Sequence, residues 1–243
     1  MSKLAIITVH KNFDRYLLKT IKSVSSQKSK PDLHLIVAKQ LNKSLITKVK
    51  NKYTKFIVGK DKSLWNAMNI GLKNTSKYYV IFINSGDELI YFKSITLIRN
   101  AIKKYKQRCL IFKNLNFYEG LTFEIKKFFF NKENYSPHPS FIRPPCNNFF
   151  FDENIYISSD AIWMKKNIYF FGKKKIFKNL SMHYLGGQSS KPTFFSMKHQ
   201  FALSFFDGLK ELVKFFLFKI MSQKIYYYLI YFYKCKVYLK KCN

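Results

Sequence analysis

The first 90 residues alternate between short apolar runs and segments in which apolar residues recur every three or four positions. The apolar, β-branched runs predict buried strands over residues 4–9, 33–38, 55–58 and 78–83. The helical spacing predicts helices over residues 14–26, 45–52 and 64–74. Strands that alternate with helices are typical of an α/β fold with a mostly parallel sheet, whose ligands bind beyond the carboxyl ends of the strands.

The pattern becomes less regular after residue 90. We expect helices over residues 94–105 and 159–166, and strands over 110–112 and 180–184. Aromatic residues predict an irregular hairpin region over 114–132, and prolines predict loops at 136–140 and 144–148, on either side of the segment 141–143. A chain of 243 residues without an internal repeat can bury a substantial core, so we expect one elaborated domain with an appendage.

The chain changes character after Lys198, where Phe, Leu, Tyr and Ile are interrupted every few residues by Lys. The lysine-free runs fall well short of the ~20 residues that a membrane span requires. We therefore expect residues 196–243 to form a basic, amphipathic helical region that contacts the inner membrane surface. The N-terminal apolar run of about six residues is too short for a secretory signal. The four widely spaced cysteines form no metal-binding pair, so we expect a cytoplasmic protein, peripheral at the membrane.

The positive charge is the most unusual feature of the composition. The chain has 44 Lys and Arg against 13 Asp and Glu, a formal net charge of +31, which favours polyanionic partners. Arg occurs only four times, however, although proteins that recognise bases favour its bidentate fork. The lysines are spread over the whole chain, and their excess together with Asn, Ile, Phe and Tyr also fits a coding sequence biased toward A and T. We expect no nucleic-acid partner, and a polyanion-binding protein remains an alternative.

Two aspartates lie at the ends of predicted elements, one after a strand and one at the start of a helix. Asp87 closes the strand over 78–83 in the sequence Asn84-Ser85-Gly86-Asp87, where a carboxylate can coordinate a divalent cation that neutralises a diphosphate. The same four residues are all turn formers, so an ordinary turn is the alternative. Asp160 lies at the start of the helix predicted over 159–166, where it can act as an N-cap or, within reach of a hydroxyl group, as a general base.

The surroundings of these aspartates resemble the GT-A family 2 glycosyltransferases that build bacterial surface polysaccharides such as O-antigen, capsule and exopolysaccharide. The segment DKSLWNAMNIG, residues 61–71, is similar to the family's D-K-G-[IL]-[YW]-[DN]-A-M-N-x-G helix, and residues 82–87 are similar to its F-L-N-S-G-D strand end. Further matches follow the family's order: Thr8-Val9 with Asn12, the segment 23–27, the H-x-x-F-x-R-like segment 138–143, the segment 151–160 and the G-G-x-S segment 186–189. Together they extend from residue 4 to about residue 190.

This resemblance implies a GT-A domain, Rossmann-like, over residues 1–195, with a nucleotide-sugar-binding half at 1–90 and an acceptor-side half at 91–195. Asp87 would hold Mn²⁺ or Mg²⁺ against the diphosphate of a UDP-sugar, and Asp160 would deprotonate a glycan or lipid-linked glycan acceptor, so that transfer inverts configuration. The implied donor-binding residues are Thr8, Val9, Asn12, Asp61, Asn66, Asn69, Ser85 and Gly86. The implied contacts to acceptor or diphosphate are His138, Gly186 and Gly187.

Three assignments stay open within the resemblance. His183 is a second candidate metal ligand, although a buried core histidine is the commoner case. His138 can equally be a turn residue between prolines. Trp65 can stack on the donor or belong to the core.

The chain departs from the family pattern at two positions. Lys39 follows the second strand where the family carries an Asp that contacts the nucleotide, and a lysine cannot accept a hydrogen bond from uracil or ribose. Ser63 replaces the glycine after Asp61-Lys62, which restricts the backbone at that point. A catalytically degenerate partner subunit of a polysaccharide assembly is therefore the main alternative to an active transferase.

Overall fold

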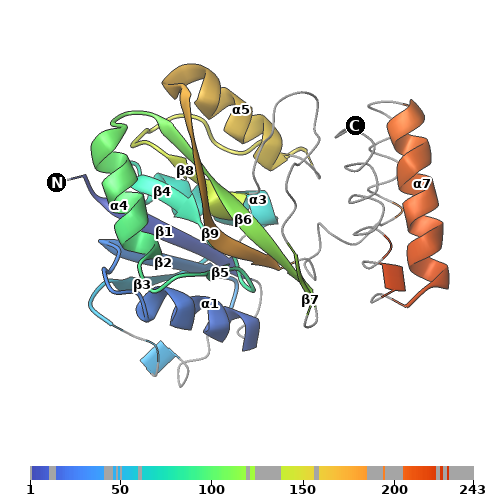
Figure 1. Ribbon diagram of the computed structural model, residues 1–243, viewed down its shortest axis with the longest axis horizontal. Helices are drawn as coiled ribbons and strands as arrows, with labels where there is room; N and C mark the ends of the chain where they lie inside the picture. Colours follow the sequence, from blue (N-terminus) through green and yellow to red (C-terminus); the bar gives the residue numbers. More distant parts are fainter. Residues whose placement is uncertain are drawn as a thin grey trace. The chain divides into compact units, whose positions relative to one another are not determined.

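The computed structural model describes residues 2–10, 15–40, 46, 47, 49, 51–59, 62–118, 121–123, 138–155, 159–184, 194, 205–222, 225, 226 and 229. Its described strands form one sheet in the order β3-β2-β1-β4-β8-β6-β9-β5, with β7 paired to β6 (Figure 1). The strands are β1 Leu4–His10, β2 Leu33–Ala38, β3 Thr54–Val58, β4 Tyr79–Phe82, β5 Glu88–Leu89, β6 Cys109–Tyr118, β7 Leu121–Phe123, β8 Phe141–Arg143 and β9 Lys173–Tyr184. The described helices are α1 Arg15–Ser25, α3 Leu64–Lys73, α4 Ser94–Lys104, α5 Ser159–Phe171, α7 Phe205–Ile220 and the short 3₁₀ helix His138–Ser140.

The first half of the sheet is parallel and the second half contains antiparallel pairs. Strands β3, β2, β1 and β4 run in the same direction, as the alternation of strands and helices predicts. Beyond β4, the pairs β4–β8, β8–β6, β6–β7 and β5–β9 are all antiparallel. The carboxyl ends of β1 and β4 therefore meet at one edge, where the segment 84–87 begins.

Helices cover both faces of the sheet, which explains why β1, β2 and β4 are almost continuously buried. Side chains of alternate residues point to opposite faces of a strand. Ile7 and Phe82 accordingly pack with residues of α3 and α5, whereas Ile6 and Ile81 pack with residues of α1 and α4. The result is the three-layer α/β arrangement that the sequence predicts (Figure 1).

Local sequence signals fix the ends of two helices near the candidate site. Ser63 is the N-cap of α3, and its side-chain oxygen accepts a hydrogen bond from the Asn66 backbone N–H at 3.1 Å. Its φ of −154° is an extended conformation that any residue adopts, so the replacement of the family's glycine restricts nothing here. At the other end of the sheet, α5 stops at Gly172, which has a φ of +67° and donates its N–H to Ile168 O at 2.8 Å.

Most predicted elements agree with the structure to within one or two residues, and the differences have physical reasons. The helix predicted over 159–166 continues to Phe171, and the strand predicted over 180–184 begins at Lys173. The lysines of residues 173–178 are exposed, so the first half of β9 lacks an apolar pattern. Strand β5 has only two residues and was not predicted. Of the helix predicted over 45–52, residues 46, 47 and 49 are helical and 51 and 52 are not, while 45, 48 and 50 lie outside the described residues.

The chain divides into two compact units: residues 1–115 with 126–183, and residues 116–125 with 184–243. The sequence placed the corresponding boundary near residue 195. The second unit contains α7, in the region where an amphipathic helix was expected. Among the described residues, no helix combines the length and the apolar character needed to cross a bilayer.

Candidate functional site

A tight turn follows the carboxyl end of β4. The Asp87 backbone N–H donates to Asn84 O at 2.9 Å, which closes a four-residue turn. Gly86 occupies the third position with a φ of +95°, the left-handed region that this position of a type II turn requires. The turn that the sequence allowed as an alternative is therefore present, and it carries the Asp87 side chain into the protein, where only 2% of the residue is exposed.

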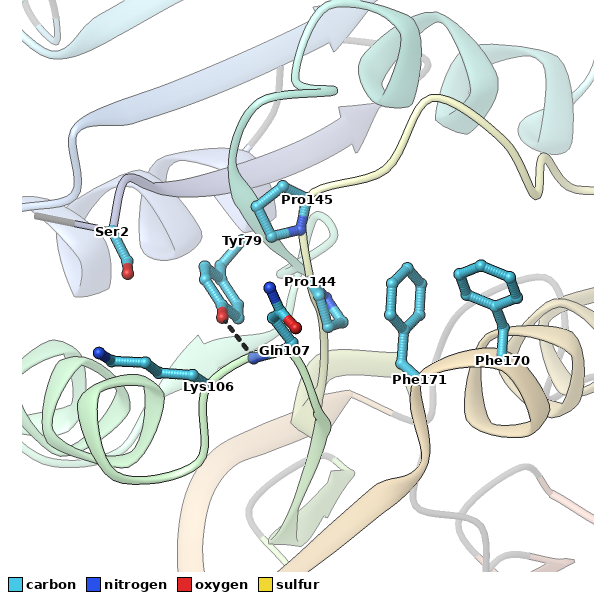
Figure 2. Close-up of a pocket in the computed structure, with 8 residues that line it drawn as sticks. All are labelled: Ser2, Tyr79, Lys106, Gln107, Pro144, Pro145, Phe170 and Phe171. Atoms are coloured by element: carbon cyan, nitrogen blue, oxygen red, sulfur yellow. Dashed lines mark hydrogen bonds between the residues drawn. The ribbon is translucent and has the colours of Figure 1, made fainter.

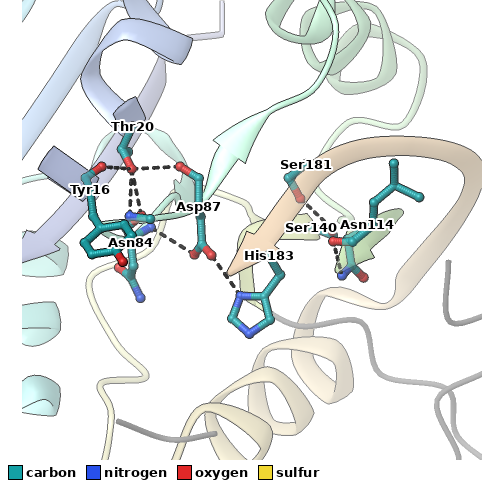
Figure 3. A network of polar contacts seen from close by, with 10 residues as sticks. Tyr16, Thr20, Asn84, Asp87, Asn114, Ser140, Ser181 and His183 are labelled. Atoms are coloured by element: carbon teal, nitrogen blue, oxygen red, sulfur yellow. Dashed lines mark hydrogen bonds and ion pairs between the residues drawn. The ribbon is translucent and has the colours of Figure 1, made fainter. Parts of the chain in front are cut away.

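Thr20 on α1 fixes this turn (Figure 3). Its hydroxyl accepts a hydrogen bond from the Gly86 N–H at 3.0 Å. The same hydroxyl lies 2.8 Å from Asp87 O and 3.1 Å from Asn84 O, and because it has one proton it donates to one of them at a time. Thr20 is fully buried on the face of α1 that packs on the sheet. The turn is thus held by side-chain contacts as well as by its own backbone.

Asp87 and His183 form the central pair of the candidate site (Figure 3). The Asp87 Oδ1 atom lies 2.8 Å from His183 Nδ1, and Asp87 Oδ2 accepts a hydrogen bond from the Asn84 N–H at 3.2 Å. The β5–β9 register explains the meeting, because it pairs Glu88 with Met182, so that Asp87 and His183 occupy the next position. The pairing of the two-residue strand β5 with β9 thus brings together two residues that lie 96 positions apart in the chain.

The electrostatics of the pair favour a positive charge on the imidazole. Burial by itself lowers the pKa of His183, but the charge of Asp87, its hydrogen bond and the charge of Asp160 act in the opposite direction. The net result is a raised pKa.

Asp160 lies in the first turn of α5, where its Oδ1 accepts a hydrogen bond from the Ala161 N–H at 2.9 Å. Carboxylates are favourable at this end of a helix. The residue is partly exposed, and its charge contributes to the pKa of His183. Asp87, His183 and Asp160 therefore belong to one electrostatic group.

The polar atoms around Asp87 match part of the needs of a divalent cation. A carboxylate oxygen and an imidazole nitrogen are suitable ligands for Mn²⁺, and carboxylate oxygens also suit Mg²⁺. The buried Ser85 hydroxyl in the same turn has no hydrogen-bond partner among the described residues, which leaves it to interact with a ligand. No cluster of three or more His, Cys, Asp or Glu suitable for a metal occurs in the described part of the chain, so phosphate oxygens and water would complete the coordination.

The side chains of Thr8 and Val9 belong to the core rather than to a donor site. The Thr8 hydroxyl is fully buried and donates to Ile83 O at 2.7 Å. Because its single proton is used there, the hydroxyl accepts from His34 Nε2, which lies 2.9 Å away. Val9 is buried in the cluster that α3 covers. Neither side chain is accessible to a nucleotide, and the donor contacts predicted for the two residues stay predictions.

The amide of Asn69 is also fully engaged inside the protein. Its Nδ2 donates to Phe151 O at 3.0 Å and to Glu153 Oε1 at 2.8 Å, and its Oδ1 accepts from the Phe151 N–H at 2.8 Å. Asn66 is partly exposed, and its Nδ2 lies 3.1 and 3.0 Å from the two Glu153 carboxylate oxygens. Trp65 is buried and stacks on Phe151 with ring centroids 5.5 Å apart, which is the core role.

The structure describes only some of the remaining predicted residues. Gly86 shapes the turn, and its N–H is used by Thr20. Lys39 is exposed just after β2. Asn12, Asp61, Gly186 and Gly187 lie outside the described residues, as does the side chain of His138. Their predicted roles stay predictions.

Sequence reasoning missed Thr20 and Glu153. A weak signal existed for Thr20, because it is a polar residue on the otherwise apolar face formed by Leu17, Ile21 and Val24. Glu153 was part of the segment compared with the family, but its partners Asn66 and Asn69 lie more than 80 positions away in the sequence. Only the fold brings these groups together.

A separate cavity lies at the opposite edge of the sheet (Figure 2). It has a volume of about 700 Å³ and is lined by Ser2, Tyr79, Lys106, Gln107, Pro144, Pro145, Phe170 and Phe171. Ser2 precedes β1, and Tyr79 is the first residue of β4, so the cavity faces the amino ends of the parallel strands. Because Asp87 follows the carboxyl end of β4, this cavity is not the candidate site.

Neither a protein-family model nor a curated protein matches the chain. Solved structures of TarS from S. aureus are similar to it. The fragment 1–349 in complex with UDP-GlcNAc matches with a TM-score of 0.60 and 17% identity, covering 79% of this chain and 61% of TarS 1–349. The same fragment with UDP gives 0.58 and 15%, with coverage of 75% and 60%.

A longer TarS structure matches with a TM-score of 0.59 and 14% identity, covering 88% of this chain. The chain thus spans about three fifths of the TarS fragment and 43% of the longer TarS chain. At these identities the comparison concerns the arrangement of the backbone. The chain has a fold like the GT-A fold of TarS.

Proposed function

We propose that the protein is a glycosyltransferase that moves a sugar from a nucleotide-diphosphate donor to a hydroxyl group of a glycan acceptor. The observation that carries the proposal is the pair of the buried Asp87 and the partly buried His183, at 2.8 Å, at the carboxyl end of β4, with Asp160 close enough to affect its electrostatics. Ligands of parallel α/β sheets bind at this edge. Two acidic residues and an imidazole at such an edge suit a reaction that needs a cation and a base.

A UDP-sugar is the donor that we propose. TarS has been solved with UDP and with UDP-GlcNAc, and the described part of this chain shares its fold. The regular N-cap geometry of Ser63 removes one reason to suspect a degenerate site. Lys39 is exposed beside the same edge, where its positive charge can approach a phosphate rather than accept a hydrogen bond from a base.

The proposed reaction is a single displacement with inversion at the anomeric carbon. Asp160 accepts the proton of the acceptor hydroxyl, and the oxygen forms a bond to the anomeric carbon. The bond between that carbon and the diphosphate oxygen breaks, and its electron pair leaves with the nucleotide. Asp87, with His183 as the weaker candidate, would hold Mn²⁺ or Mg²⁺, which would neutralise the charge of the leaving diphosphate.

Nucleotide release tests this proposal. The protein is mixed with a panel of UDP-sugars and Mn²⁺, with and without candidate glycan acceptors, and released UDP is identified by mass spectrometry. We expect release by the wild type and at least about 100-fold less with Asp87→Ala or Asp160→Ala. Equal rates in all three proteins contradict the mechanism. No release with any donor supports the alternative of a non-catalytic partner subunit.

We further propose that the acceptor is lipid-linked and that α7 brings the enzyme to the cytoplasmic face of a membrane, in surface-polysaccharide synthesis. Exposed apolar residues recur on α7 at three- and four-residue spacing: Phe206, Leu209, Val213, Phe216 and Ile220. Lys210, Lys214 and Lys219 are exposed on the same helix. From residue 212 to residue 243 the sequence contains seven lysines and no Asp or Glu, which suits an anionic lipid surface.

Vesicle sedimentation tests the membrane proposal. We expect the full chain to bind vesicles that contain phosphatidylglycerol, and the double variant Val213→Glu/Phe216→Glu to bind at least about tenfold more weakly. The matched control, Tyr169→Glu/Phe177→Glu, adds the same charges at exposed positions outside α7. An equal loss of vesicle binding in both double variants contradicts the proposal. So does a wild-type protein that forms a stable dimer which only the α7 variant dissociates, because α7 would then bind a second copy of the chain.

A further inference from the structure

Asn69 on α3 holds the loop that leads to Asp160. The amide makes a reciprocal pair with the Phe151 backbone, donating to its carbonyl at 3.0 Å and accepting from its N–H at 2.8 Å. A third bond joins Nδ2 to Glu153 at 2.8 Å. An aspartate in this position has no N–H to donate, so the pattern requires an amide. Asn69 is 4% exposed, which makes each of these bonds costly to lose.

The Phe151 ring extends the same connection to α5. It lies between two indoles, with its centroid 5.5 Å from that of Trp65 on α3 and 4.6 Å from that of Trp163 on α5. The interplanar angles are 18° and 19°, so the three rings stack nearly parallel. The Trp163 Nε1–H donates to Phe149 O at 2.6 Å. The loop is therefore fixed to both helices.

A direct hydrogen bond connects this loop to the helix turn that carries Asp160. The Ser159 hydroxyl donates to Asp152 O at 2.9 Å, which joins the start of α5 to the residue after Phe151. Asp160 is the next residue of α5. Phe151 is thus connected to Asp160 through Asp152, one hydrogen bond and Ser159.

Glu153 completes the connection on the surface. Asn66 and Asn69 are three positions apart on α3, so their amides lie on one face of the helix and both reach the Glu153 carboxylate. The carboxylate accepts bonds from neutral donors, and its residue is exposed. The amides that the sequence assigned to the nucleotide are accordingly used to hold this loop.

We propose that Asn69 is a positioning residue, which together with Glu153 holds the loop 151–153 and through it the general base Asp160. The inference rests on the proposed function, because it concerns the base of that reaction. We therefore expect the amides of Asn66 and Asn69 to affect the turnover rate and not the affinity for the nucleotide. Misplacement of a catalytic group by about 1 Å can reduce the rate by about 100-fold.

Steady-state kinetics and calorimetry with the full chain separate the two roles. For Asn69→Ala we expect kcat, corrected for the folded fraction, to fall by about 10- to 100-fold. We expect the Kd of UDP with Mn²⁺ to stay within about twofold of the wild type. Asn74→Ala is the matched control, because Asn74 ends the same helix, is exposed and its side-chain amide donates to Ile70 O.

Glu153 variants keep the test decisive if Asn69→Ala does not fold. Glu153 is exposed, so Glu153→Ala should fold and lower kcat by about tenfold. Glu153→Gln retains an oxygen that can accept from both amides and should restore most of that loss. Weaker UDP binding with unchanged kcat would instead make these residues donor contacts. Unchanged kcat in both alanine variants, while Asp160→Asn is inactive, overturns this inference alone. Wild-type activity in Asp160→Asn overturns the proposed function.

Discussion

Two groups of residues use a carboxylate in different ways. One is the turn around Asp87, and the other is a clamp formed by Asn66, Asn69 and Glu153. In the turn, the Asp87 carboxylate is buried and paired with His183, a group whose charge can change. In the clamp, the Glu153 carboxylate is exposed and paired with the neutral amides of Asn66 and Asn69. We propose a metal cation for the first arrangement, whereas the second is already satisfied within the protein. The partner of a polar group, rather than its residue type, indicates which of the two is a ligand site.

We expect the largest loss of activity from a substitution in the turn around Asp87. Asp87→Asn keeps the shape of the side chain but removes its charge, so the leaving diphosphate loses its cation site. We expect UDP release to fall by at least about 100-fold. The distinction between the turn and the clamp is contradicted if Asp87→Asn retains more than a tenth of the wild-type rate of UDP release while Asn69→Ala loses a larger share of that rate.

The next effect concerns the base. Asp160→Asn cannot accept the acceptor proton, and we expect transfer to fall by about 100-fold or more. Binding of UDP with Mn²⁺ should stay unchanged, because the asparagine still caps the first turn of α5. Calorimetry beside initial-rate measurements checks both parts, and a parallel loss of binding and transfer would assign Asp160 to the donor instead.

Thr20→Val tests how strongly the turn depends on α1. The variant keeps the volume but leaves the Gly86 N–H without its acceptor and removes the single hydroxyl proton that Asn84 O and Asp87 O share. We expect the free energy of unfolding to fall by about 2 kcal/mol. The matched variant Thr96→Val removes a part-buried bond to Ser29 and should cost less. Urea denaturation measures both, and equal losses would show that the turn is not held in this way.

The pair Thr8–His34 provides a pH test of the interior polar groups. Burial lowers the pKa of His34 from 6.5 to about 3. Because the folded pKa lies below the unfolded one, stability is complete above pH 6.5 and is lost as the pH falls toward 3. At pH 5 the loss relative to pH 7 is about 2 kcal/mol from this group. Urea denaturation at both pH values should show a smaller loss in His34→Gln, and an equal loss would contradict the assignment.

The sequence predicted the parallel half of the fold well because its strands are buried on both faces. Residues 33–38 form β2 with the predicted bounds, and every one of them is buried. The lysine-rich start of β9 escaped prediction because an exposed strand with charged side chains has no apolar alternation. A two-residue strand such as β5 has too few positions for any periodicity.

The candidate site was predictable only where it depends on local sequence. Asp87 follows an apolar strand and a turn, and both features are visible in the chain. Its contact with His183 depends on the β5–β9 register, which no local pattern encodes. The family resemblance assigned Asn69 to the donor, and its hydrogen bonds to Phe151 could not be predicted because the two residues lie 82 positions apart. Long-range pairing, rather than residue type, decided each of these cases.

Calorimetric titration of UDP into the protein, with Mn²⁺ and then with EDTA, tests the central claim most directly. We predict binding that requires Mn²⁺ and that weakens by at least about tenfold in Asp87→Asn, while Asn69→Ala binds like the wild type. Binding of UDP that is unaffected by EDTA and by Asp87→Asn would contradict the claim that the turn after β4 is the cation and diphosphate site.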